Sequence, residues 1–481
     1  DFQNAWDLSK KQFGEMNSPK TTYQTSLITR AGTWLASSYR AKGQELYNKG
    51  NYQEASIDFQ KALEIAKIQL GDEDPKTLLN AAWLASAYHE IGQYRDALNL
   101  NQSILETRSR QLPDSHDDIL LTKSRIASNY GLLGNYQEAL KINEEIYLTR
   151  KKTLGDKDPK TIQALHNIGT NYLRLGKLKE GLEIEIKVTE LNKEILGIKN
   201  KSTINSMAVL ATLNDKLGNY EKSVKLREEV LSLRQEIFGE SNPATHTAMG
   251  DLAQSYTSLG RYADALLLNE KTLKLRLETL GPSHLYTLTS KGNLAISYTN
   301  LGRYNESANL SEQILSQSID SFGVTHPFTL NAMSNLAAVY QHQNRNKESL
   351  ELIKKAYELR VETLGAKHNQ TLETMAILAT AYNRNGANEK ALETQNDLLK
   401  LRIEVLGEKN PLTIQTMSGI ANTLGLLGRT NEQLELRKKV YAIRREVLGD
   451  THPNTLQIID QLSRTYQKAN DIPMAASLSS A

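Results

Sequence analysis

The sequence predicts an all-α solenoid built from about eleven helix–turn–helix repeats of 42 residues. Two residue columns carry this prediction, and both keep one register along nearly the whole chain. The first is a turn residue at Gly50, Gly92, Gly134, Gly176, Gly218, Gly260, Gly302, Asn344, Gly386, Gly428 and Asn470. The second is a Leu-Gly or Phe-Gly pair whose glycine falls at 71, 155, 197, 239, 281, 323, 365, 407 and 449. Two columns with one period and no insertion indicate a single repeated unit.

Within a repeat, the first helix is expected from about residue 77 to 91. Asp74-Pro75 marks its start, because an Asp side chain can cap the helix and Pro suits its first position. Gly92 ends it, since glycine readily adopts the left-handed conformation. The second helix is expected from about residue 94 to 112. Ala85 and Ala97 represent two columns of small residues, which predict close helix packing between repeats.

Length and composition exclude several other classes of protein. The 481 residues would normally suggest three or four domains, but no stretch resembles a linker. A net charge of +3 argues against a nucleic-acid or polybasic membrane surface. The absence of Cys excludes disulfides, thiolate metal sites and a Cys nucleophile. No apolar run approaches the roughly 18 residues of a membrane span, so we expect a cytoplasmic protein without membrane contact.

These motifs resemble the tetratricopeptide repeat (TPR) family, in its 42-residue kinesin light chain-like form. The resemblance rests on segments such as 322–340 (FGVTHPFTLNAMSNLAAVY) and 280–309, and it covers roughly residues 30–475. It implies a right-handed superhelix whose first helices line a concave groove that binds a peptide or protein segment. Similar arrays accompany NTPase switch domains and caspase-like peptidase domains in bacterial and fungal proteins.

Three segments are expected along the chain. Residues 1–28 are predicted to form an atypical N-terminal helix, a cap or the remnant of an upstream repeat. Residues 29–470 are predicted to form one continuous array, and 471–481 a truncated last helix. Since residue 1 is Asp and the array stops within a repeat, we expect a piece of a longer protein.

The concave groove is the best candidate for a binding site. The family's geometry assigns the following residues to it: Asn167, Thr170, Arg174, Thr212, Lys216, Asp251, Gln254, Asn293, Asn300, Asn335, Gln341, His342, Asn383, Arg384 and Asn422. Asn167, Asn293 and Asn335 match the Asn that, in the family, hydrogen-bonds the backbone of a bound peptide. An amide both donates and accepts, so a row of amides suits an extended chain. The alternative is that these amides are merely solvated.

Signals for catalysis or metal binding are lacking in the sequence. Five of nine histidines fall in the turns between repeats, where they are expected to cap helices. No HExxH, GxSxG or phosphate-binding glycine motif occurs. We therefore predict that the chain is not an enzyme, has no catalytic residue and binds neither a metal nor a cofactor.

One arginine column offers two interpretations. Its members are Arg108, Arg150, Arg234, Arg276, Arg360, Arg402 and Arg444. A Glu follows two residues later in five repeats, which favours a ladder of charge contacts on the outer helices. The alternative is a basic stripe for nucleic acid, which the glutamates disfavour.

Three tryptophans, Trp6, Trp34 and Trp83, lie in the first sixth of the chain. They are expected either to thicken the apolar core of the first repeats or to form a docking surface.

The function that we predict is a scaffold or sensor binding a peptide or protein segment, as the regulatory part of a larger protein. The alternatives are control of an attached peptidase or NTPase effector domain, and, less favoured, nucleic-acid binding.

Overall fold

A computed structural model describes residues 22–450, 452–469 and 473–474, with side chains from residue 29 onward. The described residues form helices α2 to α22 and no β-strand, which confirms the all-α prediction. They form two compact units, residues 1–153 and 154–481. None of these helices combines the length and apolarity needed to cross a membrane.

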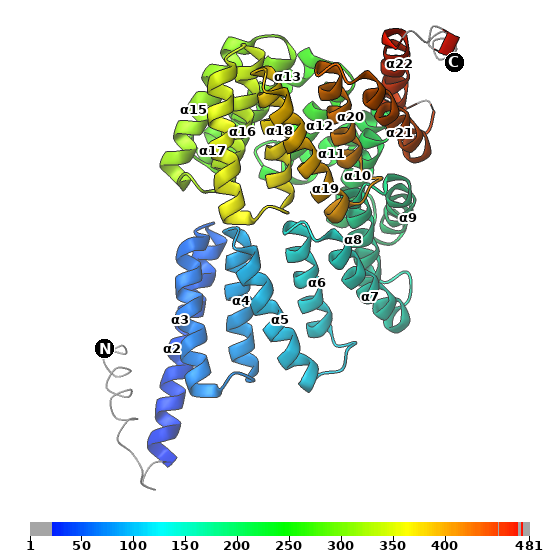
Figure 1. The fold of residues 1–481 in the computed structure, drawn as a ribbon. Coiled ribbons are helices and arrows are strands. Elements are labelled where there is room, and N and C mark those ends of the chain that lie inside the picture. The colour runs from blue at the N-terminus through cyan, green and yellow to red at the C-terminus, as the bar shows by residue number, and fades with distance from the viewer. Residues whose placement is uncertain (1–21, 451, 470–472, 475–481) are drawn as a thin grey trace. The chain divides into compact units, whose positions relative to one another are not determined.

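The described residues of the first unit form six helices, and the first five of these pack on one another in sequence order (Figure 1). They are α2 (Thr22–Asn48), α3 (Tyr52–Leu70), α4 (Pro75–Glu90), α5 (Tyr94–Gln111), α6 (Asp117–Leu132) and α7 (Tyr136–Leu154). Trp83 on α4 stacks on Phe59 at 5.5 Å between ring centroids and lies in the core of this unit. Trp34 on α2 is instead 57% exposed, and Trp6 lies outside the described residues. The predicted core role is therefore confirmed for Trp83 alone.

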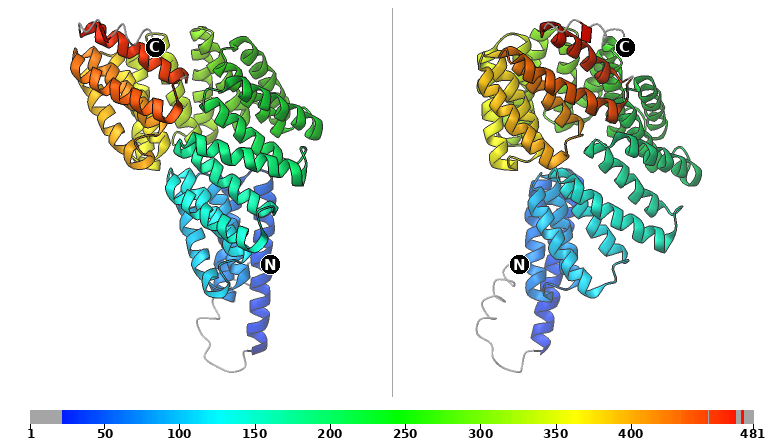
Figure 2. Two further views of the ribbon diagram at one scale, coloured as in Figure 1. Left: turned by 90° about the vertical axis from the view of Figure 1, so that its right-hand side faces the viewer. Right: turned by 45° about the vertical axis from the view of Figure 1, so that its right-hand side comes forward.

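The second unit continues the same alternation of first and second helices (Figure 2). It comprises α8 (Pro159–Leu175), α9 (Leu178–Leu196), α10 (Lys201–Lys216), α11 (Tyr220–Phe238), α12 (Pro243–Ser258), α13 (Tyr262–Leu280), α14 (Leu285–Asn300), α15 (Tyr304–Phe322), α16 (Pro327–His342), α17 (Asn346–Leu364), α18 (Asn369–Arg384), α19 (Asn388–Leu406), α20 (Pro411–Leu426), α21 (Thr430–Leu448) and α22 (Pro453–Lys468). Within this unit, each helix from α8 to α22 packs on the next one in the chain. The predicted domain boundaries stay a prediction, and most of 471–481 lies outside the described residues.

Helix starts follow the capping chemistry that the sequence indicates. Asp74 accepts a hydrogen bond from the Lys76 N–H at 2.7 Å, so α4 begins at Pro75. The five turn histidines do the same with Nδ1, at N···N distances of 3.0 to 3.2 Å; they are His116, His284, His326, His368 and His452. The predicted capping role of these histidines is confirmed.

The turn column requires the left-handed conformation. Asn344 is the one non-glycine with positive φ among the described residues, at 61°, and it stands where the other repeats have glycine. Asn tolerates this conformation better than most residues, so the repeat folds despite the substitution.

Small residues bring the two helices of each repeat together. Ala295 and Ala337 are 4% and 0% exposed on their first helices. In two of the repeats where the second helix carries Ser instead of Ala, the hydroxyl donates to the backbone of the first-helix column. Ser307 donates to Ala295 O at 2.8 Å, and Ser349 to Ala337 O at 2.7 Å. The small columns are therefore packing positions, as predicted.

Repeats far apart in the sequence also meet within the second unit. The side-chain amide of Asn410, at the start of α20, donates to Leu175 O at the end of α8 at 3.0 Å. One repeat further along, the turn at Gly218 lies against His452 and Pro453 at the start of α22. We call this two-part contact the seam.

Candidate functional site

The candidate binding site is a pocket of about 410 Å³ between α14, α15 and α16, which we call the central pocket. Its lining consists of Leu288, Thr289, Gly292, Asn293, Ala295, Ile296, Thr299, Ser311, Ile314, Phe328, Asn331, Ala332, Asn335, Ala338, Val339 and His342. No Asp, Glu, Lys or Arg occurs among these residues in the described part of the chain. The pocket is therefore neutral, with amides and hydroxyls set among apolar side chains.

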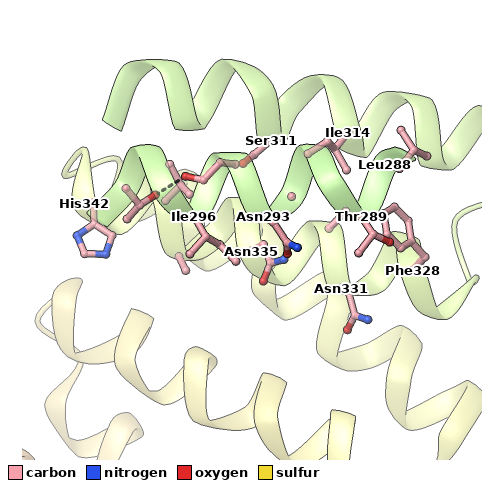
Figure 3. Close-up of a pocket in the computed structure, with 16 residues that line it drawn as sticks. Leu288, Thr289, Asn293, Ile296, Ser311, Ile314, Phe328, Asn331, Asn335 and His342 are labelled. Atoms are coloured by element: carbon pink, nitrogen blue, oxygen red, sulfur yellow. Dashed lines mark hydrogen bonds between the residues drawn. The ribbon is translucent and has the colours of Figure 1, made fainter. Parts of the chain in front are cut away.

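Two predicted site residues meet in this pocket. Asn293 on α14 and Asn335 on α16 occupy the same position of consecutive repeats, and Figure 3 shows their side chains next to each other. Asn335 is exposed and Asn293 half-buried. Neither side-chain amide has a hydrogen-bond partner among the described residues. Both amides are thus available to a ligand.

Helix periodicity explains why these amides face the pocket. In each Asn-Leu-Ala segment, the Leu and the Ala turn into the core, with Leu294 7% exposed and Leu336 2%. The preceding Asn then lies about 100° from the Leu and about 200° from the Ala around the helix axis, on the side that borders the pocket. The same geometry places Asn331 one turn before Asn335, in the same pocket.

His342 closes one end of the central pocket. It is the last residue of α16, and its ring stacks on Tyr304 with 5.1 Å between centroids and 10° between planes. The ring is exposed and presents a flat face that a ligand can contact.

Sequence reasoning missed the apolar part of the pocket. Ile296 is 49% exposed although it is a large aliphatic residue, and Phe328 lies at the other end of the pocket. Ile296 is three residues after Asn293, on the same helix face. The available signal was a large aliphatic residue in a column that holds Gln254 in the repeat before and the small Ala338 in the repeat after.

Several other predicted groove residues are occupied by neighbours. Gln341 is 7% exposed and donates to Ser349 Oγ at 3.3 Å, so it lies between helices and not in the groove. Asn383 donates to Thr423 Oγ1 at 2.7 Å, and Arg384 donates to Gln341 O at 3.4 Å. Thr212 accepts from an Arg227 guanidinium nitrogen at 3.3 Å. These contacts serve the packing between repeats.

The remaining predicted residues are spread along the second unit. Asn167 accepts from Gln163 Nε2 at 3.1 Å. The pKa of the half-buried Asp251 carboxyl is raised by burial, although nearby arginines act in the opposite direction. Lys216 and Asn422 line a second pocket around α20 and α22. Four further residues lie elsewhere on first helices, outside both pockets: Thr170, Arg174, Gln254 and Asn300.

The arginine column differs from the expected charge ladder. Arg276 Nη1 donates to Tyr286 O and Ser290 Oγ, both at 2.8 Å, and Arg402 Nη1 donates to Leu412 O and Thr416 Oγ1, both at 2.7 Å. The guanidinium groups thus tie each second helix to the first turn of the next repeat through neutral acceptors. All seven arginines are buried or half-buried, so they do not form a basic stripe on the surface.

The glutamates beside this column face outward instead. Glu236 pairs with Lys199 at 2.5 Å, and Glu194, in the equivalent position of the repeat before, pairs with Lys157 at 2.5 Å. The prediction of Arg–Glu contacts was wrong because side chains two residues apart on an α-helix point about 200° apart, onto opposite faces.

No group of three or more His, Asp or Glu side chains in the described ranges is arranged to hold a metal ion. The prediction that the chain is not an enzyme stays a prediction.

Paired helices and stacked repeats define an α-solenoid protein. A tetratricopeptide repeat family model matches residues 34–110, 118–194, 202–278, 286–360, 328–404 and 412–479. The chain belongs to this family, whose repeats generally mediate protein–protein interaction. The predicted family is confirmed.

Similar solved structures include two of the nearly identical TPR-like repeats of a Podosopora anserina protein described as a kinesin light chain. Both are 24% identical with a TM-score of 0.37; one covers 42% of this chain and 95% of its own, the other 43% and 98%. BtubC (BKLC) from P. vanneervenii is 19% identical with a TM-score of 0.36, over 48% of this chain and 91% of its own. No protein with a curated description matches the chain.

Proposed function

We propose that the chain is an interaction scaffold or sensor that holds an extended segment of a partner protein, with the central pocket as the main contact. One observation carries this proposal: Asn293 and Asn335 lie side by side, from consecutive repeats, with both amides available. An extended peptide has unpaired N–H and C=O groups, and a side-chain amide can pair with one of each. In this mode of recognition, the two amides contact the backbone of the bound peptide.

The apolar residues of the pocket would add side-chain recognition. Ile296 and Phe328 flank the two amides, and the stacked ring of His342 lies at one end. A pocket that combines apolar walls with a few polar groups is typical of ligand sites. Since the lining is neutral, we expect the contacting ligand segment to carry an apolar side chain flanked by uncharged residues.

The wider role remains part of the proposal. In a stack of repeats held by nearest-neighbour contacts, a bound segment favours the curvature that fits it. The array would then be the regulatory part of a larger cytoplasmic protein. Control of an attached effector domain is the alternative, and it uses the same binding surface.

The test uses the full chain and a peptide selected on it from a random-peptide phage library, with affinity measured by fluorescence anisotropy. Asn293→Ala combined with Asn335→Ala should weaken binding about 30-fold, because two hydrogen bonds of about 1 kcal/mol each are lost. The control is Asn309→Ala combined with Gln313→Ala, two exposed residues of the second helix α15 that do not line the pocket, and it should bind as the wild type does. Equal affinity in both double variants would place the site elsewhere.

A further inference from the structure

The seam is a built contact between repeats that lie far apart in the sequence. Asn410 and Leu175, which share its hydrogen bond, are each 4% exposed. A Cβ added at Gly176 would lie 2.4 Å from Pro411 Cδ, whereas one added at Gly428 would meet nothing within 4 Å. The backbone at Gly176 therefore touches the start of α20 directly.

Behind the seam lies a pocket of about 580 Å³, which we call the seam pocket. Its floor consists of inner-face residues of α20 and α22, among them Gln415, Asn422 and Gln461. Leu178 and Lys216 line it from the other side of the seam. The pocket thus includes residues of repeats that only the seam brings together.

The charge of the seam pocket has one sign. Lys216, Arg402 and Arg444 all line it, and none of its lining residues in the described part of the chain is Asp or Glu. Arg402 is 2% exposed and Arg444 is 9% exposed. Burying a cation without a carboxylate is costly, and a bound anion would relieve that cost.

Arg402 also has hydrogen-bond donors that are not paired in the described structure. Its Nη1 donates to Leu412 O and Thr416 Oγ1, but its buried Nε has no partner among the described residues. In the equivalent Arg360, Nη2 donates to Asn331 Oδ1. The matching position beside Arg402 is Glu373, whose exposed carboxylate accepts from Asn369 Nδ2 and attracts the Arg402 charge, but which accepts no hydrogen bond from Arg402 in the described structure. One edge of the Arg402 guanidinium therefore remains available.

We propose that the seam pocket binds a small oxyanion, a phosphate or carboxylate group, and that this ligand holds the seam closed. The planar guanidinium of Arg402 provides the paired donors that such groups accept, with Arg444 and Lys216 as further cations. Because Lys216 and the arginines lie on opposite sides of the seam, an anion between them stabilises the closed form. The site does not depend on peptide binding at the central pocket.

The first test measures binding of inorganic phosphate and, separately, of succinate to the full chain by calorimetry at constant ionic strength. Saturable binding of either supports the proposal, and the better ligand identifies the source of the oxyanion. Lys216→Gln should weaken it about fivefold, the effect of losing one partly solvated ion pair. Lys468→Gln, at the same position of α22 but outside the pocket, should bind normally. Binding of neither anion, or equal affinity in both variants, would overturn the proposal.

The second test separates binding from closure. Gly176→Ala should abolish measurable phosphate binding or weaken it at least about tenfold, because its Cβ forces the seam apart. Gly428 has the same φ of 73° as Gly176, so Gly428→Ala introduces the same backbone strain. Its added Cβ would meet no atom within 4 Å, so this variant should bind phosphate as the wild type does. Equal affinity in these two variants would show that closure plays no part. If Gly176→Ala does not fold, the comparison of Lys216→Gln with Lys468→Gln decides alone.

Discussion

The central pocket and the seam pocket are built from the same positions of the repeat, three repeats apart, yet they differ in charge. Thr289 and Asn331 of the first correspond to Gln415 and Gln457 of the second. Ile296 corresponds to Asn422, so an apolar wall has become polar. The backbone framework is shared, and a few substitutions decide which kind of ligand each pocket suits.

The buried arginines show this difference most clearly. Asn331 accepts from Arg360 and lines the central pocket, so that guanidinium is turned away from any ligand. Glu373 takes the place of Asn331 in the next repeat and accepts from Asn369 Nδ2 at 3.2 Å instead. Burial lowers the pKa of both Arg360 and Arg402 to about 10. The Nε of both arginines lacks a partner in the described structure, so the difference lies in Nη2, which donates to a side chain in Arg360 only.

The largest effect should come from replacing these arginines with an apolar side chain. Arg360→Met should lower the free energy of unfolding by about 4 kcal/mol, because three acceptors lose a charged donor. Arg402→Met should cost only about 2 kcal/mol, because fewer bonds are lost and an incompletely paired buried charge is removed. Urea unfolding followed by circular dichroism gives both values. Equal losses would mean that the two guanidiniums are equally well satisfied.

A smaller loss of stability is expected from replacing Asn331, which accepts from Arg360, or Glu373, which occupies the matching position beside Arg402. Asn331→Ala should cost about 2 kcal/mol, since it leaves a nitrogen of buried Arg360 without its acceptor. Glu373→Ala, the matched change at an exposed position, should alter stability by less than about 0.5 kcal/mol. The same urea experiment measures both. A large loss in Glu373→Ala would show that this carboxylate does serve Arg402.

The smallest effect concerns pH and the histidine caps of the two pockets. Burial is the main cause that lowers the pKa of His326, at the start of α16, and of His452, at the start of α22, below the ordinary value of 6.5; for His452, Arg444 acts in the same direction. The unfolded chain therefore binds more protons, and stability should fall as pH decreases below about 6.5. Protonation also removes the Nδ1 acceptor of the cap.

Asn caps α20 at Asn410, so replacing either histidine with Asn should preserve the helix cap. Because Asn does not titrate, the substitution should also remove part of this pH dependence. Thermal unfolding of His326→Asn and His452→Asn between pH 7.5 and 5.5 measures the change. Wild-type slopes in both variants would assign the pH dependence to other groups.

Much of the fold could be predicted from the sequence, because helix starts and turns depend on local chemistry. The Asp-Pro and His-Pro caps, the left-handed turn glycines and the Asn344 substitution all act within a few residues. The central pair Asn293 and Asn335 was also among the predicted site residues. Gln341 was predicted beside them, but its packing against Ser349 depends on a neighbouring helix that periodicity does not position. The acceptors of the arginines lie on the next repeat and were missed for the same reason, but helical spacing alone already separates an Arg from a Glu two residues later.

By itself, then, the sequence determined the repeat, its helices and the shared position of Asn293 and Asn335, since each follows from a pattern of period 42 or from helical spacing. Only the tertiary structure decided which arginines are buried against neutral carbonyls, and that Leu175 meets Asn410. The physical reason is that a solenoid's curvature accumulates from small rotations at each repeat interface. The sequence of one repeat does not specify which distant repeat it will contact. The seam and the seam pocket therefore depend on the rotations of all the repeats between them.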